Sequence, residues 1–264
     1  MLGVMAPGPL SSPAPLPMAP VTLAAEGAAA ANLRVGAHVL RWPTEAYAAG
    51  LDVLELQVPV PRPKGGTLTQ WRRAAPGLAV NLKLDDTLWQ AALSKAASGK
   101  GSADTHWLGL AVAALKPECL VLQPGGSLTP SANGRRRLSE GFAALRALGI
   151  AELAWQPAGV WEVLPALKFA AAERVRLVLD PLAQDDEAWE ALVQSGQLPY
   201  LRVIAVGRQA RISLGAYDRL LRRLEVLQPS CGSHRPLELV FEGHSGAKTA
   251  MQFKRFAQNP VADF

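Results

Sequence analysis

Short apolar runs alternate with longer amphipathic stretches from Arg34 to the end of the chain. The runs are rich in Val, Leu and Ile, as buried parallel strands are, whereas the stretches between them carry Ala, Leu and Arg at helical spacing. We expect strands at 33–38, 53–58, 78–84, 119–124, 151–156, 175–180, 201–207 and 237–243. Eight strands with interleaved helices in about 230 residues predict an α/β protein with a (β/α)8, TIM-barrel-like fold.

The stretches between these runs predict the helices of the barrel. We expect them at 66–74, 86–98, 104–115, 133–149, 158–172, 185–195, 213–228 and 245–257. Asn133 is expected to cap the fourth helix and Gly149 to end it. A doubly wound open sheet is the alternative, but its Gly-x-Gly-x-x-Gly turn after the first strand is absent.

Residues 1–32 have a different composition from the rest of the chain. They are mostly Ala, Pro, Gly, Ser and Leu, with one charged residue, Glu26. Repeated prolines oppose both helix and central strand, so we predict a disordered Ala/Pro-rich N-terminal tail and one barrel domain over 33–264. No basic residue precedes Arg34 and no long apolar run occurs, so neither a signal peptide nor a membrane span is expected. With only two cysteines and no disulfide framework, a cytoplasmic location is expected.

The formal net charge of +5 favours anionic partners in a general way. The excess is scattered, and its densest points, at 135–137 and 219–223, fall on predicted helices. Solvated helix faces are therefore favoured over a nucleic-acid surface. A small anionic ligand is the expected partner, with a protein partner as the alternative, and no pattern identifies a cofactor.

Nearly every predicted strand ends in a polar residue. Active sites of (β/α)8 barrels gather at the C-terminal ends of the strands, so these side chains are expected to meet at one mouth. The residues concerned are His38, Gln57, Lys83, Gln123, Gln156, Asp180, Arg202, Glu242 and His244. A ligand site is therefore predicted at this end of the barrel.

Five charged residues are candidates for the chemistry of this site, four of them as catalytic residues and Arg202 as a ligand-binding residue. Glu55 and Glu242 are predicted as general acid or base, Lys83 and Arg202 as anchors for an anionic group, and Asp180 as a group that orients water or a metal. Two alternatives stay open. Glu55 is equally suited to an internal ion pair with Lys83 on the next strand, and Asp180, which precedes a proline, to starting a turn.

The segment "FEGHSGAK" at the end of the last predicted strand has two interpretations. Gly243 permits a sharp turn, and Ser245 is suited to cap a helix whose amides, with Lys248, would bind phosphate. The alternative is an ordinary capped turn. His38 and His244 would lie close together in a closed barrel, but without an H-E-x-x-H motif or a cysteine cluster no metal site is predicted.

Several stretches share their order and spacing with one known family. They are "LDVLELQVPVPRPKGGTLTQWRRAAPGLAVNLKL", "CLVLQPGGSL", "YLRVIAVGRQARISLGAYDRLLRRL" and "LELVFEGHSGAKTAMQFKRFA". Together they resemble the DUF72 (YecE-like) family, with Glu55, Trp71, Pro76, Lys83 and the Gln123–Pro124 pair at matching positions. The resemblance covers roughly residues 33–258 and implies a TIM barrel whose biochemical role is largely unestablished.

The chain departs from the DUF72 pattern at its most polar positions. The opening Gly-x-Ser-Gly-Trp-like motif is "GAHVLRW", with Gly36 kept and His38 in place of the serine–glycine pair. Ala154 and Gln156 stand where the resemblance implies a carboxylate and a guanidinium, and "FEGH" replaces the asparagines of the last strand. An activity that needs those groups is therefore not expected in this chain.

Two classes of function follow from these observations. The first is an enzyme with residual acid/base hydrolytic activity at the mouth; the second is a non-catalytic, degenerate barrel that acts as a binding or scaffold protein. An enzyme should have a carboxylate near Lys83 or a histidine in an open mouth. The second class tolerates a mouth filled by Trp155, Trp161 or the 125–134 loop.

Overall fold

A computed structural model describes residues 21–23, 31–43, 48–150, 152–204, 212–227 and 235–258. Eight parallel strands, β2 to β9, follow one another around a closed barrel, since β2 pairs with both β3 and β9. The strands are β2 (Ala31–Val39), β3 (Val53–Gln57), β4 (Ala79–Leu84), β5 (Cys119–Leu122), β6 (Glu152–Trp155), β7 (Arg176–Leu179), β8 (Tyr200–Ile204) and β9 (Leu237–Glu242).

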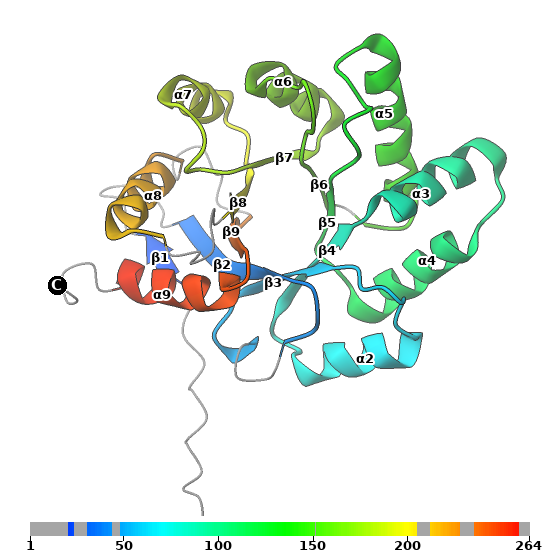
Figure 1. Ribbon diagram of the computed structural model, residues 1–264, viewed down its shortest axis with the longest axis horizontal. Coiled ribbons are helices and arrows are strands. Elements are labelled where there is room, and N and C mark those ends of the chain that lie inside the picture. The colour runs from blue at the N-terminus through cyan, green and yellow to red at the C-terminus, as the bar shows by residue number, and fades with distance from the viewer. Residues whose placement is uncertain are drawn as a thin grey trace, which may run out of the picture.

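Helices surround the strands on the outside of the barrel (Figure 1). They are α2 (Gly65–Ala74), α3 (Asp86–Ser98), α4 (Ala103–Leu115), α5 (Ala132–Arg146), α6 (Val163–Glu173), α7 (Asp186–Ser195), α8 (Leu214–Leu227) and α9 (Gly246–Gln258). The predicted (β/α)8 fold and its eight strands are thus confirmed. Residues 151 and 205–207 of the predicted strands lie outside the described residues.

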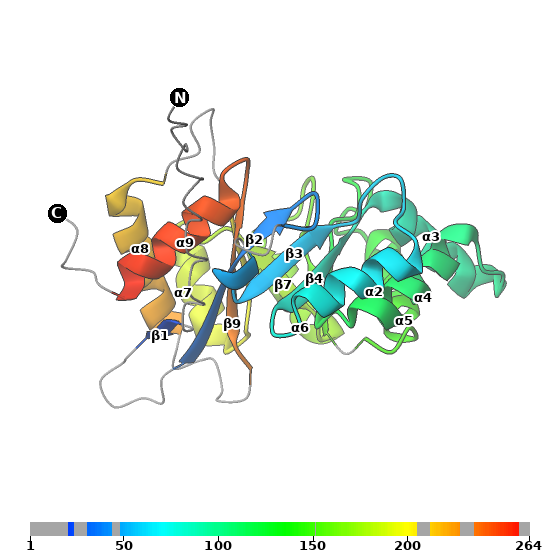
Figure 2. The same ribbon diagram turned by 90° about the horizontal axis from the view of Figure 1, so that it is seen from below.

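One short strand precedes the barrel. Residues Val21–Leu23 form β1, which pairs antiparallel with Ala31–Leu33 at the start of β2 (Figure 2). Three residues of the segment predicted as a disordered tail therefore join the sheet, and β2 begins two residues before the predicted boundary at 33. Residues 1–20 and 24–30 of that tail lie outside the described residues.

Side-chain caps explain where several helices begin. Asp85 accepts a hydrogen bond from the Leu88 amide at 2.9 Å at the start of α3, and Ser102 and Thr105 form a capping box on α4. Helix α5 is capped by Ser131, which accepts from Gly134 N at 3.2 Å, so the predicted Asn133 cap is wrong by two positions. Gly149 lies just beyond that helix with a φ of +83°, a conformation suited to glycine.

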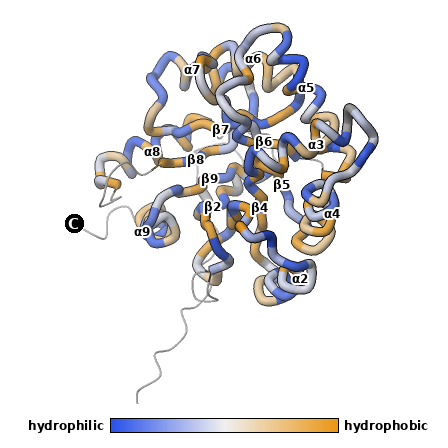
Figure 3. Tube along the Cα trace, turned by 45° about the vertical axis from the view of Figure 1, so that its right-hand side comes forward, coloured by the Kyte–Doolittle hydropathy of each residue, from blue (hydrophilic) through white to orange (hydrophobic). Residues whose placement is uncertain are grey.

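Apolar side chains form two separate cores. The larger one, between the strands and the surrounding helices, is built largely from leucines, and apolar positions gather on the central strands (Figure 3). The smaller core lies inside the barrel. It consists of alternate strand residues: Val53, Ala79, Cys119, Val121, Ala154, Val178, Tyr200 and Val240. Side chains on the same, inward face of each strand, two or four residues closer to the C-terminal end, therefore point toward the mouth of the barrel.

The outer core contains a cluster of aromatic rings. Trp155 packs edge-on against Trp161, with ring centroids 4.9 Å apart, and against Phe169 at 5.6 Å. Trp161 also donates from Nε1 to the Leu128 carbonyl at 2.6 Å, which fixes the loop after β5. Both tryptophans thus pack in the helix layer, outside the barrel interior.

Candidate functional site

Register and alternation bring the polar residues at the strand ends into two layers. His38 on β2 lies opposite Glu55 on β3, and Gln57, two residues on, lies opposite Lys83 on β4. On the neighbouring strands β8 and β9, which complete the barrel next to β2, Ile204 lies opposite Glu242. Glu55 therefore belongs to a deeper layer than Lys83 and Glu242.

The deeper layer is built around a bidentate ion pair. Arg202 Nη2 donates to both carboxylate oxygens of Glu55 at 2.6 Å, and neither side chain is more than 1% exposed. His38 Nδ1 donates to Glu55 Oε1 at 2.8 Å. Gln156 completes the layer by accepting a hydrogen bond from Arg202 Nη1. Charge-assisted, paired contacts of this kind hold buried charges in one geometry.

Burial of Glu55 works against its charge, but its partners outweigh that effect. Desolvation alone would raise the pKa of the carboxyl, whereas Arg202 and the hydrogen bond from His38 lower the pKa to about 2. Burial likewise acts to lower the pKa of Arg202, and Glu55 reverses this and raises it above its ordinary value. Glu55 is thus held ionised, which fits a fixed electrostatic platform and not a group that exchanges protons near neutral pH.

The layer at the mouth holds a second, looser pair of charges. Lys83 Nζ lies 3.9 Å from Glu242 Oε1, and Glu242 Oε2 lies 3.6 Å from Arg202 Nε. Both separations exceed an ordinary hydrogen bond, so Glu242 bridges the two cations without a direct contact to either. The Lys83 side chain is 9% exposed and that of Glu242 29% exposed. Burial and the nearby Arg202 lower the pKa of Lys83, against the opposing effect of Glu242 and Glu55.

Glu55 forms the expected internal ion pair, but its partner is Arg202 and not Lys83. Lys83 is aligned with Gln57 and lies one layer above Glu55, whose register neighbour on β4 is Asn81. Arg202 reaches across the barrel interior from β8 and takes the place that Lys83 was expected to fill. Arginine suits this position because its planar group has several donors, so that Nη2 contacts both oxygens of Glu55 while Nη1 donates to Gln156.

Asp180 has a structural role at the end of β7. Its Oδ1 accepts from the Leu182 amide at 2.8 Å and its Oδ2 from the Ile204 amide at 3.1 Å. These contacts match the turn interpretation and also tie the end of β7 to β8. Both oxygens of its carboxylate therefore bind backbone amides. Among the described residues, Asp180 makes no contact with Lys83 or Glu242 that would support its predicted catalytic role.

The remaining predicted residues lie nearer the rim. Gln57 is half-buried, whereas Gln123 after β5, His244 before α9 and Lys248 in the first turn of α9 are exposed. In the "FEGHSGAK" turn, Gly243 has a φ of +121°, which bears out the glycine requirement. The Gly246 amide donates to the Gly243 carbonyl at 3.0 Å and the half-buried Ser245 accepts from Thr249 through its carbonyl at 2.9 Å. Phosphate binding at this turn stays a prediction.

Two interior residues were missed by the sequence analysis. Asn81 is fully buried on β4 and donates from Nδ2 to the Tyr200 hydroxyl at 3.2 Å, while its Oδ1 is buried without a hydrogen-bond partner. Burial and the nearby carboxylates raise the pKa of Tyr200, so its hydroxyl stays protonated. The available signal was alternation, because Ala79, Asn81 and Lys83 share one face of β4.

The opposite, N-terminal end of the barrel interior also contains charges. Arg176 donates to Glu238 Oε2 at 2.7 Å and to the Pro199 carbonyl at 2.7 Å, and the side chains are 11% and 3% exposed. Arg34 pairs with Glu118, and Arg235 with Glu152 at 2.5 Å. The buried Arg176–Glu238 pair is typical of a structural ion pair, whereas the Arg34–Glu118 and Arg235–Glu152 pairs are partly exposed.

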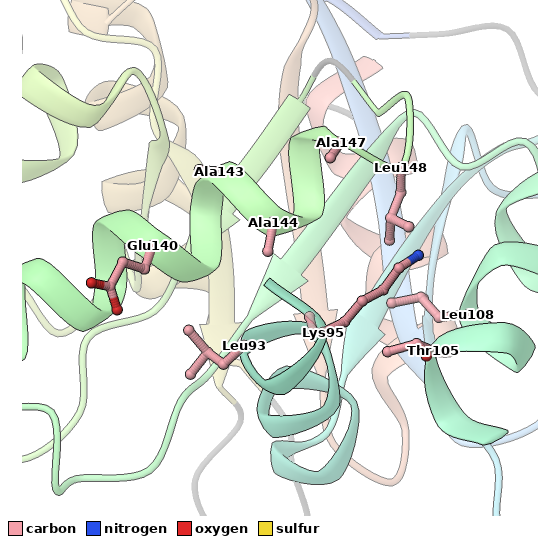
Figure 4. A pocket seen from close by; sticks show the side chains of 10 residues that line it. Leu93, Lys95, Thr105, Leu108, Glu140, Ala143, Ala144, Ala147 and Leu148 are labelled. Carbon is pink, nitrogen blue, oxygen red and sulfur yellow. The ribbon is translucent and has the colours of Figure 1, made fainter. Parts of the chain in front are cut away.

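A separate concavity lies on the outer surface between α3, α4 and α5 (Figure 4). Its cavity volume is about 510 Å³. Its lining is mainly alanine and leucine, and none of the barrel-interior residues contributes to it. The lining residues are Ala92, Leu93, Lys95, Thr105, Leu108, Glu140, Ala143, Ala144, Ala147 and Leu148. This groove is therefore distinct from the mouth and lacks its paired charges.

Two further findings concern the described part of the chain. No group of three or more His, Cys, Asp or Glu side chains there is arranged to hold a metal ion. Within the same residues, no helix combines the length and the apolar character needed to cross a membrane.

Comparison with known proteins gives structural neighbours. No family model and no curated protein matches the chain. A DUF72 family protein from Enterococcus faecalis superposes with a TM-score of 0.57 at 13% identity, over 88% of this chain and 97% of that one. A DUF72 family protein from Thermotoga maritima gives 0.52 at 14%, over 79% and 85%.

A third neighbour comes from a different group of barrels. The structure of an L-ribulose 3-epimerase superposes with a TM-score of 0.52 at 16% identity, over 87% of this chain and 93% of that one. At such identities the likeness shows a shared fold, and functions differ widely among barrels of this fold.

Proposed function

We propose that the protein binds a small polar molecule at the mouth of the barrel, between Lys83 and Glu242. One observation carries the proposal: these two groups face each other at 3.9 Å, above a Glu55–Arg202 pair that is closed at 2.6 Å. A separation of 3.9 Å suits two groups that act through a bridging atom. The deeper pair keeps its own charges satisfied and provides a rigid floor.

The surroundings of the mouth support an open site over a filled one. Trp155 and Trp161, which a degenerate barrel would tolerate in the mouth, pack against Phe169 in the outer layer. The Trp161–Leu128 hydrogen bond also ties Leu128, in the loop after β5, to this outer layer. These contacts favour a ligand site, and the non-catalytic scaffold becomes one outcome of the test below.

The charges at the mouth limit the form of the ligand. Lys83 and Arg202 are balanced by Glu242 and Glu55, so the four groups together carry no net charge. An anionic ligand, which the positive net charge of the chain favours, would have to displace the Glu242 carboxylate from Lys83. A ligand with hydroxyl or carbonyl groups would instead hydrogen-bond to both.

Acid–base chemistry, including hydrolysis, is the reaction class that we propose for this site. Of the two glutamates, Glu242 is partly exposed and able to exchange a proton with a ligand or water, whereas Glu55 is fully buried and held ionised. Glu242 is therefore the proposed acid or base, and Glu55, Arg202, His38 and Gln156 position the floor beneath it.

We also infer that the chain is a divergent relative of the DUF72 family. The fold likeness supports this, as do the positions of Glu55 and Lys83, which match the family pattern on β3 and β4. His38 and Gln156, two of the departures from that pattern, both contact the Glu55–Arg202 pair. A change of substrate relative to the family would be the expected consequence.

Ligand-induced stabilisation of the full-length protein tests the proposed site. Thermal unfolding would be followed with inorganic phosphate, sugar phosphates, free sugars, hydroxy acids and keto acids, in the wild type, Lys83→Met, Glu242→Gln and the surface control Lys168→Met. A ligand at about 100 times its Kd adds roughly 2.7 kcal/mol of stability, which raises the midpoint by several degrees. The shift should vanish in Lys83→Met and persist in Lys168→Met.

Glu242→Gln separates the two ligand classes. An anion that competes with Glu242 for Lys83 should bind more strongly in this variant, whereas a hydroxyl or carbonyl ligand that uses the carboxylate should bind more weakly. Absence of any shift, or a shift that survives Lys83→Met, would contradict a site at this mouth and favour a scaffold.

A further inference from the structure

Lys83 differs from the other buried lysine of the described chain in what its amine contacts. Lys254 is fully buried and donates to Asp52 Oδ1 at 2.8 Å, so its ammonium group is fixed by a direct ion pair. Lys83 has Glu242 at 3.9 Å as its nearest carboxylate, and the side chain reaches solvent. The amine of Lys254 is thus held in a structural ion pair, whereas the amine of Lys83 faces the mouth without a direct hydrogen bond to a carboxylate.

We propose that Lys83 forms an imine with the carbonyl group of a small aldehyde or ketone, and that Glu242 transfers the protons of this reaction. The proposal rests on the binding site inferred above and names the class of ligand for it. It does not depend on the DUF72 resemblance.

The charges around Lys83 favour an amine with an available lone pair. Only a neutral amine is a nucleophile, and lysines are made more nucleophilic by desolvation or by a neighbouring cation. Both conditions occur here: the Lys83 side chain is 9% exposed, and Arg202 lies on the far side of Glu242. Burial first, and Arg202 second, lower the pKa of Lys83. An exposed lysine such as Lys168 has neither advantage.

The geometry also provides a proton carrier at the right place. In the first step the lone pair of Nζ forms a C–N bond to the carbonyl carbon, and the π electrons of the C=O bond move to oxygen. Glu242 carries a proton from nitrogen to that oxygen, giving a carbinolamine. A second proton, taken from solvent through Glu242, releases the oxygen as water while the C=N bond forms. The cationic imine then lies beside the Glu242 carboxylate, which stabilises its charge.

The residues beside this pair suit a short carbon chain with one polar end. Ile204, in register with Glu242, is 42% exposed and offers an apolar surface at the mouth. Gln57, in register with Lys83, offers an amide that can hydrogen-bond to a carboxylate or hydroxyl. Keto acids and short hydroxyaldehydes carry these features together.

Reductive trapping tests the proposal on the full-length protein. Pyruvate and glycolaldehyde would be supplied as probes together with sodium cyanoborohydride, which reduces an imine to a stable secondary amine. Peptide mapping by mass spectrometry then reports the modified lysine and the rate at each site. Mapping of the wild type identifies the site whether or not any variant folds. The matched variants are Lys83→Met, Glu242→Gln and Lys168→Met.

We expect one dominant adduct, on Lys83, formed at least about tenfold faster than on exposed lysines such as Lys168. It should be absent from Lys83→Met, unchanged in Lys168→Met and slowed about tenfold in Glu242→Gln. Equal labelling of exposed lysines, or labelling of Lys83 at the same rate as Lys168, would overturn the proposal.

Lactate and ethylene glycol, which lack a carbonyl group, separate this proposal from the proposed function. If they stabilise the wild type but not Lys83→Met, while neither carbonyl probe modifies Lys83, the binding site stands and the imine is refuted. If neither alcohol nor carbonyl probe produces a response that depends on Lys83, both proposals fail.

Discussion

The two ends of the barrel interior hold buried charges in different ways. At the N-terminal end, Arg176 and Glu238 meet at 2.7 Å, and the arginine also donates to a backbone carbonyl. At the C-terminal end, the Glu55–Arg202 pair is just as close, at 2.6 Å, but above it Lys83 and Glu242 stay 3.9 Å apart.

The difference shows which charged side chains of the barrel are fixed in structural ion pairs and which remain free to interact with a ligand. A buried ion pair with direct hydrogen bonds contributes to a defined structure, because either partner alone would be a stranded charge. A separated amine and carboxylate contribute little to stability and keep their capacity for chemistry. The boundary between the two types lies between the Glu55 and Lys83 layers, at the end where barrel active sites occur.

Removal of one partner from a closed pair should have the largest effect. Arg202→Met leaves the Glu55 carboxylate buried without its main partner, so we expect a loss of about 3–5 kcal/mol in the free energy of unfolding. Denaturant unfolding measures it. The double variant Glu55→Gln/Arg202→Met, which removes both charges, should recover part of the loss. A loss under about 1 kcal/mol would mean that the Glu55–Arg202 pair is solvated.

Acidification should remove the same stabilisation more gradually. The pKa of Glu55 is about 2 in the folded protein, against an ordinary value of 4.5 for a solvated glutamate, so the folded state binds this proton less readily than the unfolded state. The stability due to Glu55 is therefore present above pH 4.5 and lost as the pH falls toward 2. Acid unfolding curves should show a smaller decline over this window in Glu55→Gln/Arg202→Met. Parallel curves for the two proteins would contradict the assignment.

A comparison of the two buried lysines should give a smaller effect, and it sharpens the contrast. Lys254→Met removes the cation from Asp52, whose side chain is 12% exposed and keeps the hydrogen bond from the Val35 amide, and should cost about 1–3 kcal/mol. Lys83→Met keeps the aliphatic stem and removes a charge that burial disfavours, so the free energy of unfolding should change by less than about 1 kcal/mol, in either direction. Denaturant unfolding of both variants at neutral pH provides the measurement. A larger loss for Lys83→Met than for Lys254→Met would contradict the division into closed and open pairs.

The fold was predictable because strand and helix patterns differ along the chain. Apolar runs such as "CLVLQP" and "VRLVLD" have the composition of strands buried on both faces, and they became β5 and β7. The same barrel geometry made it possible to predict that His38, Lys83, Arg202 and Glu242 lie in the C-terminal half of the barrel, since each lies in the C-terminal part or the middle of its strand. Helix starts were less predictable: Ser131 and Asn133 are both good caps, and only the extended backbone at Ser131 decides between them.

The pairing of charges within the site was not predictable from neighbouring strands. Glu55 and Lys83 lie on adjacent strands, but the register aligns Glu55 with Asn81 and places Lys83 one layer higher. The partner of Glu55 is Arg202, which lies 147 residues away in the sequence and reaches across the barrel interior. Such a contact depends on barrel closure and on the reach of the arginine side chain, and neither is encoded in local periodicity. The predicted ion pair of Glu55 named Lys83 and so missed this partner, while a catalytic role for Glu55 stays a prediction.

The ionisation of Lys83 is the property that tests the account most directly. NMR observation of its side-chain nitrogen during a pH titration would give the pKa of the amine in the wild type and in Glu242→Gln. We predict a pKa below the ordinary 10.5 in the wild type, and a lower one in Glu242→Gln because the carboxylate that opposes the effects of burial and Arg202 is gone. A pKa at or above 10.5, unchanged by Glu242→Gln, would show an ordinary solvated lysine and contradict an active site at this mouth.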